Sequence, residues 1–394
     1  MAEALSQLPS LKCLSLQCLN DLEYISDSGG GSEFSSSSSS RPIAFFPSLK
    51  EIFFFDCAAP QNPSTAVASS TIASSSSTPL SKLKSLSLDY IHDLQSLPEE
   101  GLRNLTSLQY LSISSCDRLQ TLSRGIYHLS ALQELYVGEL NLRTDKDGMH
   151  WKGLKCLVSL KFWYLPELKS LPSGLQHVTT LRKLEISHCS SLMAIPEWIQ
   201  NWTSLEQFAI ERCGSLTRLP EGMRCLISLQ SLKIRECPLL FRRCQSDEGE
   251  DWPKIAHIPK LDLNWKLVQQ TMMMKVGAIE RPSTAIAPPT LVASSSTPLS
   301  QLKSPEPEAI EDLRSLSEEV LRNLISIKDL PIQACIRLET LSHGVQPLTA
   351  RHALRLHNCI ELDLGNDEDG MQWQGLKTLH YLEFCDLLKL VSPV

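Results

Sequence analysis

The chain has 394 residues, a hydrophobic fraction of 42% and a formal net charge of −7. This apolar fraction is enough for a continuous core, and an acidic balance without a basic tract argues against a nucleic-acid-binding protein. No apolar run approaches the roughly 18 residues of a membrane span, and the N-terminus lacks the regions of a secretory signal. We therefore expect a protein of the cytoplasm or the nucleus, with no membrane partner.

Two short apolar patterns open the chain, one starting at Leu11 and the other at Leu49. Each alternates inward and outward residues over a few positions, which is typical of a strand with one buried face. The Gly/Ser-rich stretch 26–42 separates them, and the Ser/Ala/Pro-rich stretch 58–79 follows the second. Both stretches lack the apolar residues that offset ordering entropy, so they are predicted to be disordered inserts. Residues 1–57 are then an N-terminal pair of repeats.

The longest regular stretch runs over residues 80–264, where the pattern returns every 24 or 25 residues. The repeats begin at Leu83, Leu108, Leu132, Leu157, Leu181, Leu205 and Leu229. After each of these leucines, apolar residues follow at the third and fifth positions, as Leu184 and Ile186 do after Leu181. Self-similarity at this period is the signature of leucine-rich repeats. It predicts an α/β leucine-rich repeat solenoid of horseshoe shape, with short parallel strands on the concave face and irregular or short helical segments on the convex face.

A cysteine recurs at the eighth position of many repeats. The members of this cysteine column are Cys57, Cys116, Cys189, Cys213, Cys237, Cys335 and Cys359. The chain has 13 cysteines in all, an odd number, and no C-x-x-C pair, so neither a disulfide framework nor a zinc site is indicated. We interpret the column as a structural ladder of small apolar thiols, suited to a reducing compartment.

Residues 265–298 are predicted to be a linker, and residues 299–394 are a degraded copy of the earlier repeats. The sequence SSSTPLSQLKS at Ser294 matches SSSTPLSKLKS at Ser75. Further along, DGMQWQGLK at Asp369 matches DGMHWKGLK at Asp147. The terminal third of the chain therefore arose as a duplicate of an internal block.

Prolines have entered the strands of this copy. Pro305 and Pro307 replace two inward leucines of the parent block, and Pro331 lies in the next strand. Because proline removes a ladder donor, we expect the first of these strands to be lost. Residues 299–394 should pack less tightly than 80–264, and limited proteolysis should cut first near 265–310.

The outward positions of the strands form the candidate protein-binding surface. It comprises Phe53, Phe55, Tyr90, Tyr110, Tyr136, Trp163, Tyr164, His188, Arg212, Lys233 and Arg235. This surface changes from aromatic to basic along the solenoid, and aromatic and arginine side chains supply most binding hot spots. An alternative interpretation is that the exposed rings only stack on one another and stabilise the sheet.

Enzyme signatures are missing from the sequence. It contains no phosphate-binding loop, no dinucleotide fingerprint, no nucleophile elbow and no zinc-protease motif. Acidic runs at Asp247 and Asn366 lack the ligand order of a calcium loop and are expected to be solvated. We therefore predict a non-enzymatic protein with no catalytic, cofactor-binding or metal-binding residues.

Two segments carry a resemblance to a known family. LTRLPEGMRCLISLQSLKIRECPLL, from Leu216, and ECPLLFRRCQSDEGEDWPKIAHIP, from Glu236, resemble the leucine-rich region of plant intracellular NB-LRR disease resistance proteins of the coiled-coil, RGA-type class. In that family the second segment closes the repeats. The resemblance implies a sensor in innate immunity whose partner is a pathogen effector, a guarded host protein, or a nucleotide-binding domain in cis or trans. The NB-ARC domain is missing, so the ADP/ATP site of the family is not carried over.

Other interpretations remain open from the residues alone. Secreted plant repeats usually carry asparagine where this chain has the cysteine column, which disfavours an extracellular protein. A stand-alone leucine-rich repeat adaptor and a truncated, non-functional receptor relic are alternatives. Because the first repeat at Leu11 has no cap before it, we also expect it to expose an apolar edge that an upstream domain would cover.

Overall fold

A computed structural model describes residues 8, 10–18, 48–57, 81–92, 94–97, 102–122, 124–142, 151–246, 249–264, 329–333, 338, 353–359, 361–362 and 378–387. The predictions for the two inserts 26–42 and 58–79, the linker 265–298 and Cys335 lie outside these residues. So does the predicted loss of a strand at Pro305 and Pro307.

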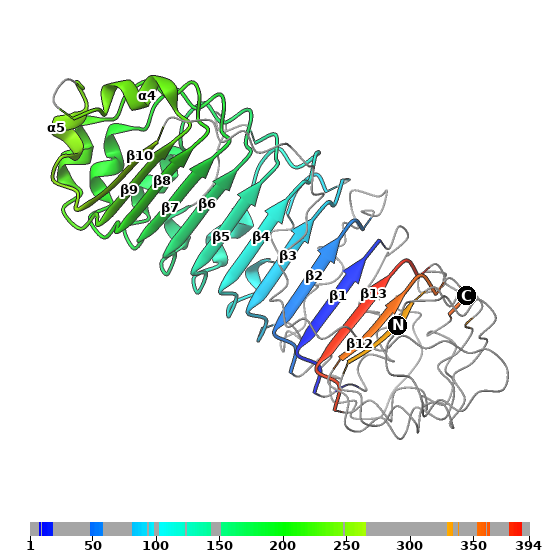
Figure 1. Ribbon diagram of the computed structural model, residues 1–394. Coiled ribbons are helices and arrows are strands. Elements are labelled where there is room, and N and C mark those ends of the chain that lie inside the picture. Colours follow the sequence, from blue (N-terminus) through cyan, green and yellow to red (C-terminus); the bar gives the residue numbers. More distant parts are fainter. Residues whose placement is uncertain are drawn as a thin grey trace.

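Thirteen strands of the described chain form one parallel sheet (Figure 1). They are β1 (Cys13–Gln17), β2 (Glu51–Phe55), β3 (Ser85–Asp89), β4 (Tyr110–Ser114), β5 (Glu134–Gly138), β6 (Ser159–Trp163), β7 (Lys183–Ser187), β8 (Gln207–Glu211), β9 (Ser231–Arg235), β10 (Lys260–Asn264), β11 (Asp329–Gln333), β12 (Ala353–His357) and β13 (Tyr381–Cys385). Neighbouring repeats pair in register, so Leu184 lies beside Phe208 and Ile186 beside Ile210. The predicted leucine-rich repeat solenoid is confirmed.

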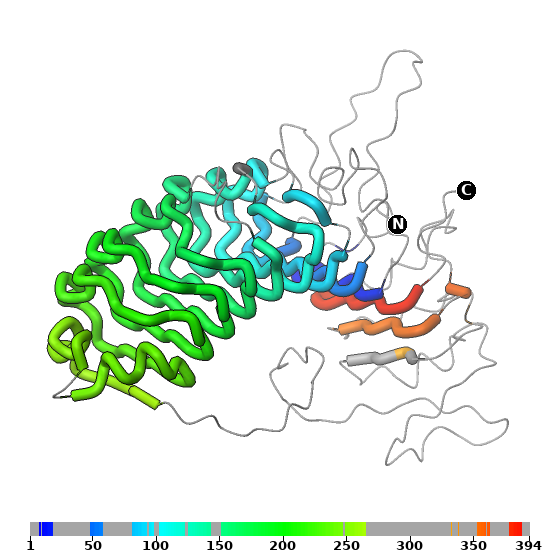
Figure 2. Tube along the Cα trace, turned by 90° about the horizontal axis from the view of Figure 1, so that it is seen from above, coloured from blue at the N-terminus to red at the C-terminus, as the bar shows by residue number. Residues whose placement is uncertain are grey.

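Short helical segments return along the convex side of the sheet (Figure 2). They are the 3-10 helices η2 (Arg124–His128), η4 (Trp151–Gly153), η5 (Ser173–His177), η6 (Glu197–Asn201) and η7 (Glu221–Cys225). The core lies between these segments and the strands, and it includes the fully buried Trp202, whose Nε1 donates to the Leu175 carbonyl at 3.0 Å. None of the helices in the described ranges has the length and hydropathy needed to span a membrane.

Two short α-helices lie at the β10 end of the sheet, α4 (Pro238–Arg243) and α5 (Trp252–Ile255). They belong to the segment that resembles the family's closing motif. Asp251, expected to be part of a solvated acidic run, is instead fully buried. It is compensated there by Arg243, Lys254 and the amide of Leu219, so the expectation of a solvated run was wrong for this residue.

The spatial order of the strands differs from their order in the chain. The sheet runs β10 to β1 and then continues β13, β12, β11, so the C-terminal repeats precede the N-terminal one in space (Figure 1). The expected exposed edge at the first repeat was therefore wrong. β1 pairs with β13 over its whole length, and Leu11 and Leu14 are fully buried. The duplicate makes this possible because its repeats present the same strand and the same register as any neighbouring repeat would.

The strand that contains Pro331 is formed. β11 pairs with β12 from Asp329 to Gln333. β11 is the last strand of the described sheet, so one of its two edges has no strand partner there. Backbone amides alternate in direction along a strand, and in the other repeats the position two residues earlier donates toward the preceding strand, as Cys13 does to His380. The missing amide of Pro331 thus faces the outer edge, where proline is tolerated.

One backbone feature recurs at the seventh position of each repeat in which that position is described, and it was not anticipated from the sequence. A left-handed conformation, with φ between 49° and 59°, occurs at Cys18, Asp56, Tyr90, Ser115, Glu139, Tyr164, His188, Arg212, Glu236, Asn358 and Asp386. None of these residues is glycine. The amide of each described member extends the ladder to the next strand, as that of Tyr164 does to Ser187 at 2.9 Å. Pairing between repeats therefore sustains a conformation that a side chain disfavours.

Substitution of Tyr164 tests this backbone constraint. Tyr164 is 52% exposed, so changes there disturb little packing. We expect Tyr164→Val to unfold at lower urea than Tyr164→Asn, with a difference of about 1–2 kcal/mol, because a β-branched residue is poorly tolerated at positive φ while asparagine is accepted. Both variants remove the ring, so their difference isolates the backbone. Equal stability of the two variants would contradict the constraint.

Candidate recognition surface on the concave face

A cavity of about 630 Å³ lies on the concave face over β2 to β6. Six of the eleven predicted surface residues line it: Phe53, Phe55, Tyr90, Tyr110, Tyr136 and Trp163. Parallel strands in register bring these side chains together although they are up to 110 residues apart in the chain (Phe53 to Trp163). The Phe55 and Tyr90 rings are in contact, with centroids 4.9 Å apart.

The remaining five predicted residues, Tyr164, His188, Arg212, Lys233 and Arg235, do not line this cavity. Trp163 links the two groups, because its ring centroid lies 6.1 Å from that of Tyr164 and 5.7 Å from that of His188. Beyond this point two of the three predicted basic residues are paired with carboxylates, and the third, Lys233, is exposed. Arg212 pairs with Glu236 at 2.8 Å, and Arg235 pairs with Asp262.

His188 lies next to Arg212, whose Nη1 is 2.8 Å from the imidazole Nε2. Burial, and then the charge of Arg212, lower the pKa of His188. The imidazole is therefore neutral at neutral pH, and its Nε2 accepts the hydrogen bond from the guanidinium. This end of the concave face is an internally paired polar network.

Acidic and hydroxyl side chains complete the lining of the cavity, and sequence reasoning missed them. They are Glu51, Asp89 and Glu139, together with Ser85, Ser87, Ser112, Ser114 and Ser115. Ser114 donates its hydroxyl hydrogen to Asp89 at 2.6 Å, and Ser115 donates to Glu139. Burial raises the pKa of Asp89, an effect that its serine hydrogen bonds only partly oppose. Scanning the outward positions for charge as well as for aromatic rings would have found these residues.

The cysteine column lies behind the strands. Cys57, Cys116, Cys189, Cys213, Cys237 and Cys359 are all buried, and their sulfur atoms contact backbone carbonyls at the strand ends, as Cys116 Sγ does with the Ser114 oxygen at 3.2 Å. Burial raises the pKa of Cys116 to about 12. These contacts favour the interpretation of the column as packing rather than chemistry.

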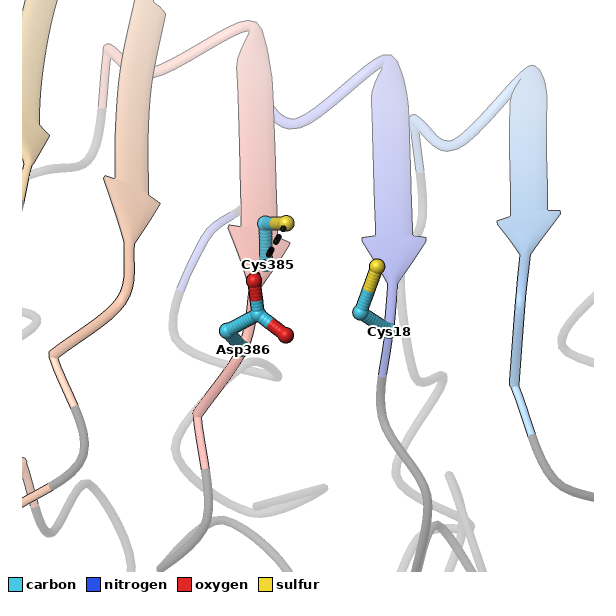
Figure 3. Close-up of side chains that lie close together, drawn as sticks. All are labelled: Cys18, Cys385 and Asp386. Carbon is cyan, nitrogen blue, oxygen red and sulfur yellow. Dashed lines mark hydrogen bonds between the residues drawn. The ribbon is translucent and has the colours of Figure 1, made fainter. Parts of the chain in front are cut away.

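One further group of side chains meets at the β1–β13 junction (Figure 3). Ligand atoms of Cys18, Cys385 and Asp386 all lie within 4.8 Å of one another. Two thiols and a carboxylate are donors that zinc accepts, but a structural zinc site uses four ligands. Burial raises the pKa of both thiols, and the charge of Asp386 raises it further. Among the described residues only three donors meet here, one fewer than a structural zinc site uses, so we assign this cluster no ligand.

Comparison with known protein families matches one part of the chain. Residues 61–197 match the family described as plant disease resistance protein RPS2-like, leucine-rich repeats. A stretch of 88 residues, 22% of this chain, is 28% identical to the volume-regulated anion channel subunit LRRC8D of Rattus norvegicus and spans 10% of that protein.

Two solved structures are among those similar to this chain. A leucine-rich repeat protein of Leptospira interrogans has 16% sequence identity and a TM-score of 0.36, with 87% of this chain and 79% of that one covered. The leucine-rich repeat domain of the type III effector XopL has 20% identity and a TM-score of 0.30, with 75% of each chain covered. Residues 61–197 of this chain are thus similar to the leucine-rich repeats of the RPS2-like plant disease resistance family.

Proposed function

We propose that this protein is a recognition module of plant innate immunity that senses a pathogen effector or a guarded host protein through its concave face. The observation that carries the proposal is the cavity over β2 to β6, lined by six aromatic side chains. Aromatic residues in a concave site supply binding energy at low entropic cost, and leucine-rich repeats hold such residues on a rigid curved sheet. The match of residues 61–197 to plant disease resistance repeats supports the immune context.

Stacking of the aromatic rings on one another accounts for the concave surface less completely than recognition of a partner does. Phe55 and Tyr90 are in contact, as are Trp163 and Tyr164. Between these two pairs, however, the lining encloses a volume of about 630 Å³. This size lies within the range of roughly 300–1,000 Å³ that is common for ligand sites. Rings that served only to stabilise the sheet would fill this space themselves.

Trp163→Ala tests the proposal. Partners identified by proximity labelling in plant tissue would be purified and titrated against the wild-type chain and the variant by calorimetry. We expect Trp163→Ala to weaken binding at least about 30-fold, since hot-spot truncations cost about 2 kcal/mol or more. Tyr164→Ala is the matched control, because Tyr164 follows directly in the chain but does not line the cavity.

The outcomes separate the competing interpretations. A partner that binds both variants as tightly as the wild type does not use the cavity, and the proposal then fails for that partner. A chain that binds no effector or host protein in these titrations fits a non-functional receptor relic. A partner that depends on Trp163 but belongs to no defence process fits a stand-alone adaptor.

A further inference from the structure

The cavity on the concave face carries uncompensated negative charge. Glu51, Asp89 and Glu139 line it, and no lysine or arginine does. Within the described part of the chain, no basic nitrogen lies within 4.0 Å of these three carboxylates; the contacts of Asp89 and Glu139 are the hydroxyls of Ser114 and Ser115. Neutral hydroxyls stabilise a carboxylate less than a cation does.

The remainder of the concave face shows the opposite arrangement. From β6 onward the carboxylates at outward positions have basic partners. The pairs are Lys161 with Glu185 at 2.7 Å, Arg182 with Glu206 at 3.1 Å, Arg212 with Glu236 at 2.8 Å, and Arg235 with Asp262. The same design at β12 and β13 pairs Arg355 with Glu383 at 3.2 Å. In the cavity, by contrast, the carboxylates lack the basic partners that these other carboxylates have.

The aromatic lining suits a cation as well. The cavity is lined by aromatic rings as well as by the carboxylates, and the faces of aromatic rings attract ammonium and guanidinium groups. The rings include Phe55, Tyr90, Tyr110, Tyr136 and Trp163. The chain already uses this interaction once at the margin of the cavity, where Lys161 Nζ lies 5.9 Å from the Tyr136 ring centroid. Lys161 nevertheless forms an ion pair with Glu185, and it does not line the cavity.

We propose that the cavity binds the guanidinium group of an arginine side chain presented by the protein partner. This inference rests on the proposed function, because it names the chemistry that the concave face recognises. A guanidinium stacks on aromatic faces and donates in a planar fork to carboxylates, so it uses both parts of the lining at once. Charge complementarity therefore favours an exposed, arginine-bearing segment over an acidic or purely apolar one.

Stability and binding should respond in opposite directions to Asp89→Asn. Because burial raises the pKa of Asp89, ionising this carboxyl group costs more free energy in the folded chain than in the unfolded chain. Asparagine removes that penalty and keeps a side-chain oxygen that accepts from Ser114. We expect the variant to melt no lower than the wild type while it loses affinity for arginine. If the Asp89 carboxylate had only a structural role, the melting temperature and the affinity for arginine would fall together.

The test uses the full chain and two amidated nonapeptides that differ at one residue. One carries arginine at its centre between glycine and serine residues, and the other carries citrulline, the neutral isostere, at that position. Calorimetry or fluorescence titration is expected to show that the wild type prefers the arginine peptide. Asp89→Asn and Glu139→Gln should each weaken its binding at least about tenfold. Glu250→Gln, which removes the same charge from an exposed side chain, should leave the affinity unchanged.

Three results would overturn the inference. They are equal binding of the two peptides, equal weakening in Glu250→Gln, and no binding of the arginine peptide below millimolar concentration. The natural partner then distinguishes this failure from failure of the proposed function. A partner that is sensitive to Trp163→Ala but indifferent to Asp89→Asn and Glu139→Gln leaves the recognition function standing and removes only the arginine anchor.

Discussion

Asp251→Ala is expected to lower the free energy of unfolding by about 3–5 kcal/mol, because it breaks a buried ion-pair network. It leaves the Leu219 amide without its acceptor, and it leaves Arg243 and Lys254 only their exposed partners Glu250 and Glu221. Asp251 accepts from the Leu219 amide at 2.9 Å and from Arg243 Nε at 3.2 Å, and Lys254 Nζ lies 3.0 Å from its other oxygen. Lys254 in turn donates to the Leu219 carbonyl at 2.7 Å. One carboxylate thus joins α4, α5 and the repeat before them.

Urea denaturation measures this effect, and Glu250→Ala is the control. Glu250 also pairs with Arg243, at 2.6 Å, but its side chain is 75% exposed. Exposed pairs contribute little, so we expect Glu250→Ala to change stability by less than about 1 kcal/mol. If the two variants lost the same stability, burial of the network would not be its source.

Acid should reproduce the loss gradually in the wild type. Burial disfavours the charged form of Asp251, but the hydrogen bonds from Arg243, Leu219 and Lys254 outweigh it and lower the pKa. A carboxyl group with a lowered pKa in the folded state stabilises the fold above its unfolded pKa, and this contribution disappears as the pH falls through the folded value. Asp251→Ala should therefore flatten the decline in stability as the pH falls below about 4, the ordinary pKa of an aspartate.

Glu383→Ala is expected to release the C-terminal repeats from β1, with a local cost of about 3–5 kcal/mol. Glu383 is fully buried at the β13 position that faces the concave side. Gln17 Nε2 donates to it from β1 at 2.8 Å, and the Tyr381 hydroxyl donates at 2.7 Å. Arg355 lies 3.2 Å away as an ion pair by distance rather than as an aligned hydrogen bond. Truncation would remove the acceptor that the Gln17 and Tyr381 side chains share and the buried carboxylate that pairs with Arg355.

Hydrogen exchange provides the measurement. The amides of Lys12 and Cys13 donate to the His380 carbonyl at 2.9 and 3.0 Å, so they report directly on the β1–β13 junction. We expect both amides to lose protection in Glu383→Ala and to keep it in Glu361→Ala, a change at an exposed glutamate of the same C-terminal repeats. Unchanged protection in Glu383→Ala would mean that the apolar contacts of Leu14 and Leu382 hold the junction without the polar network.

The junction also bears on the partner expected from the family resemblance. An upstream nucleotide-binding domain was expected to cover the apolar edge at Leu11. β13 occupies that edge. Such a domain would have to contact another part of this chain or displace the C-terminal repeats from β1. Glu383→Ala is expected to weaken the β1–β13 junction that holds these repeats in place.

The repeat pattern made the local fold predictable. Each strand depends on apolar residues at fixed offsets from one leucine, and a repeat cannot bury them without a neighbour of the same kind. The aromatic half of the cavity was predictable for the same reason, since the outward positions follow from the inward ones. Its acidic half was missed because serine and carboxylate residues at outward positions, such as Ser114 and Asp89, look like ordinary solvated surface in one dimension.

The order of the repeats in space and the state of the charged groups were decided by tertiary structure. Every repeat presents an equivalent edge, so the sequence pattern does not specify which repeats become neighbours, and β13 lies beside β1 with 363 residues between their ends (Gln17 to Tyr381). Likewise, the hydrogen-bond partners of a carboxylate come from residues about one or more repeats away in the chain. Asp251 accepts a hydrogen bond from the Leu219 amide, whereas Asp89 accepts hydrogen bonds from serine hydroxyls. Period and burial pattern are local properties of the chain, but pairing and charge compensation are properties of surfaces that exist only after the solenoid has formed.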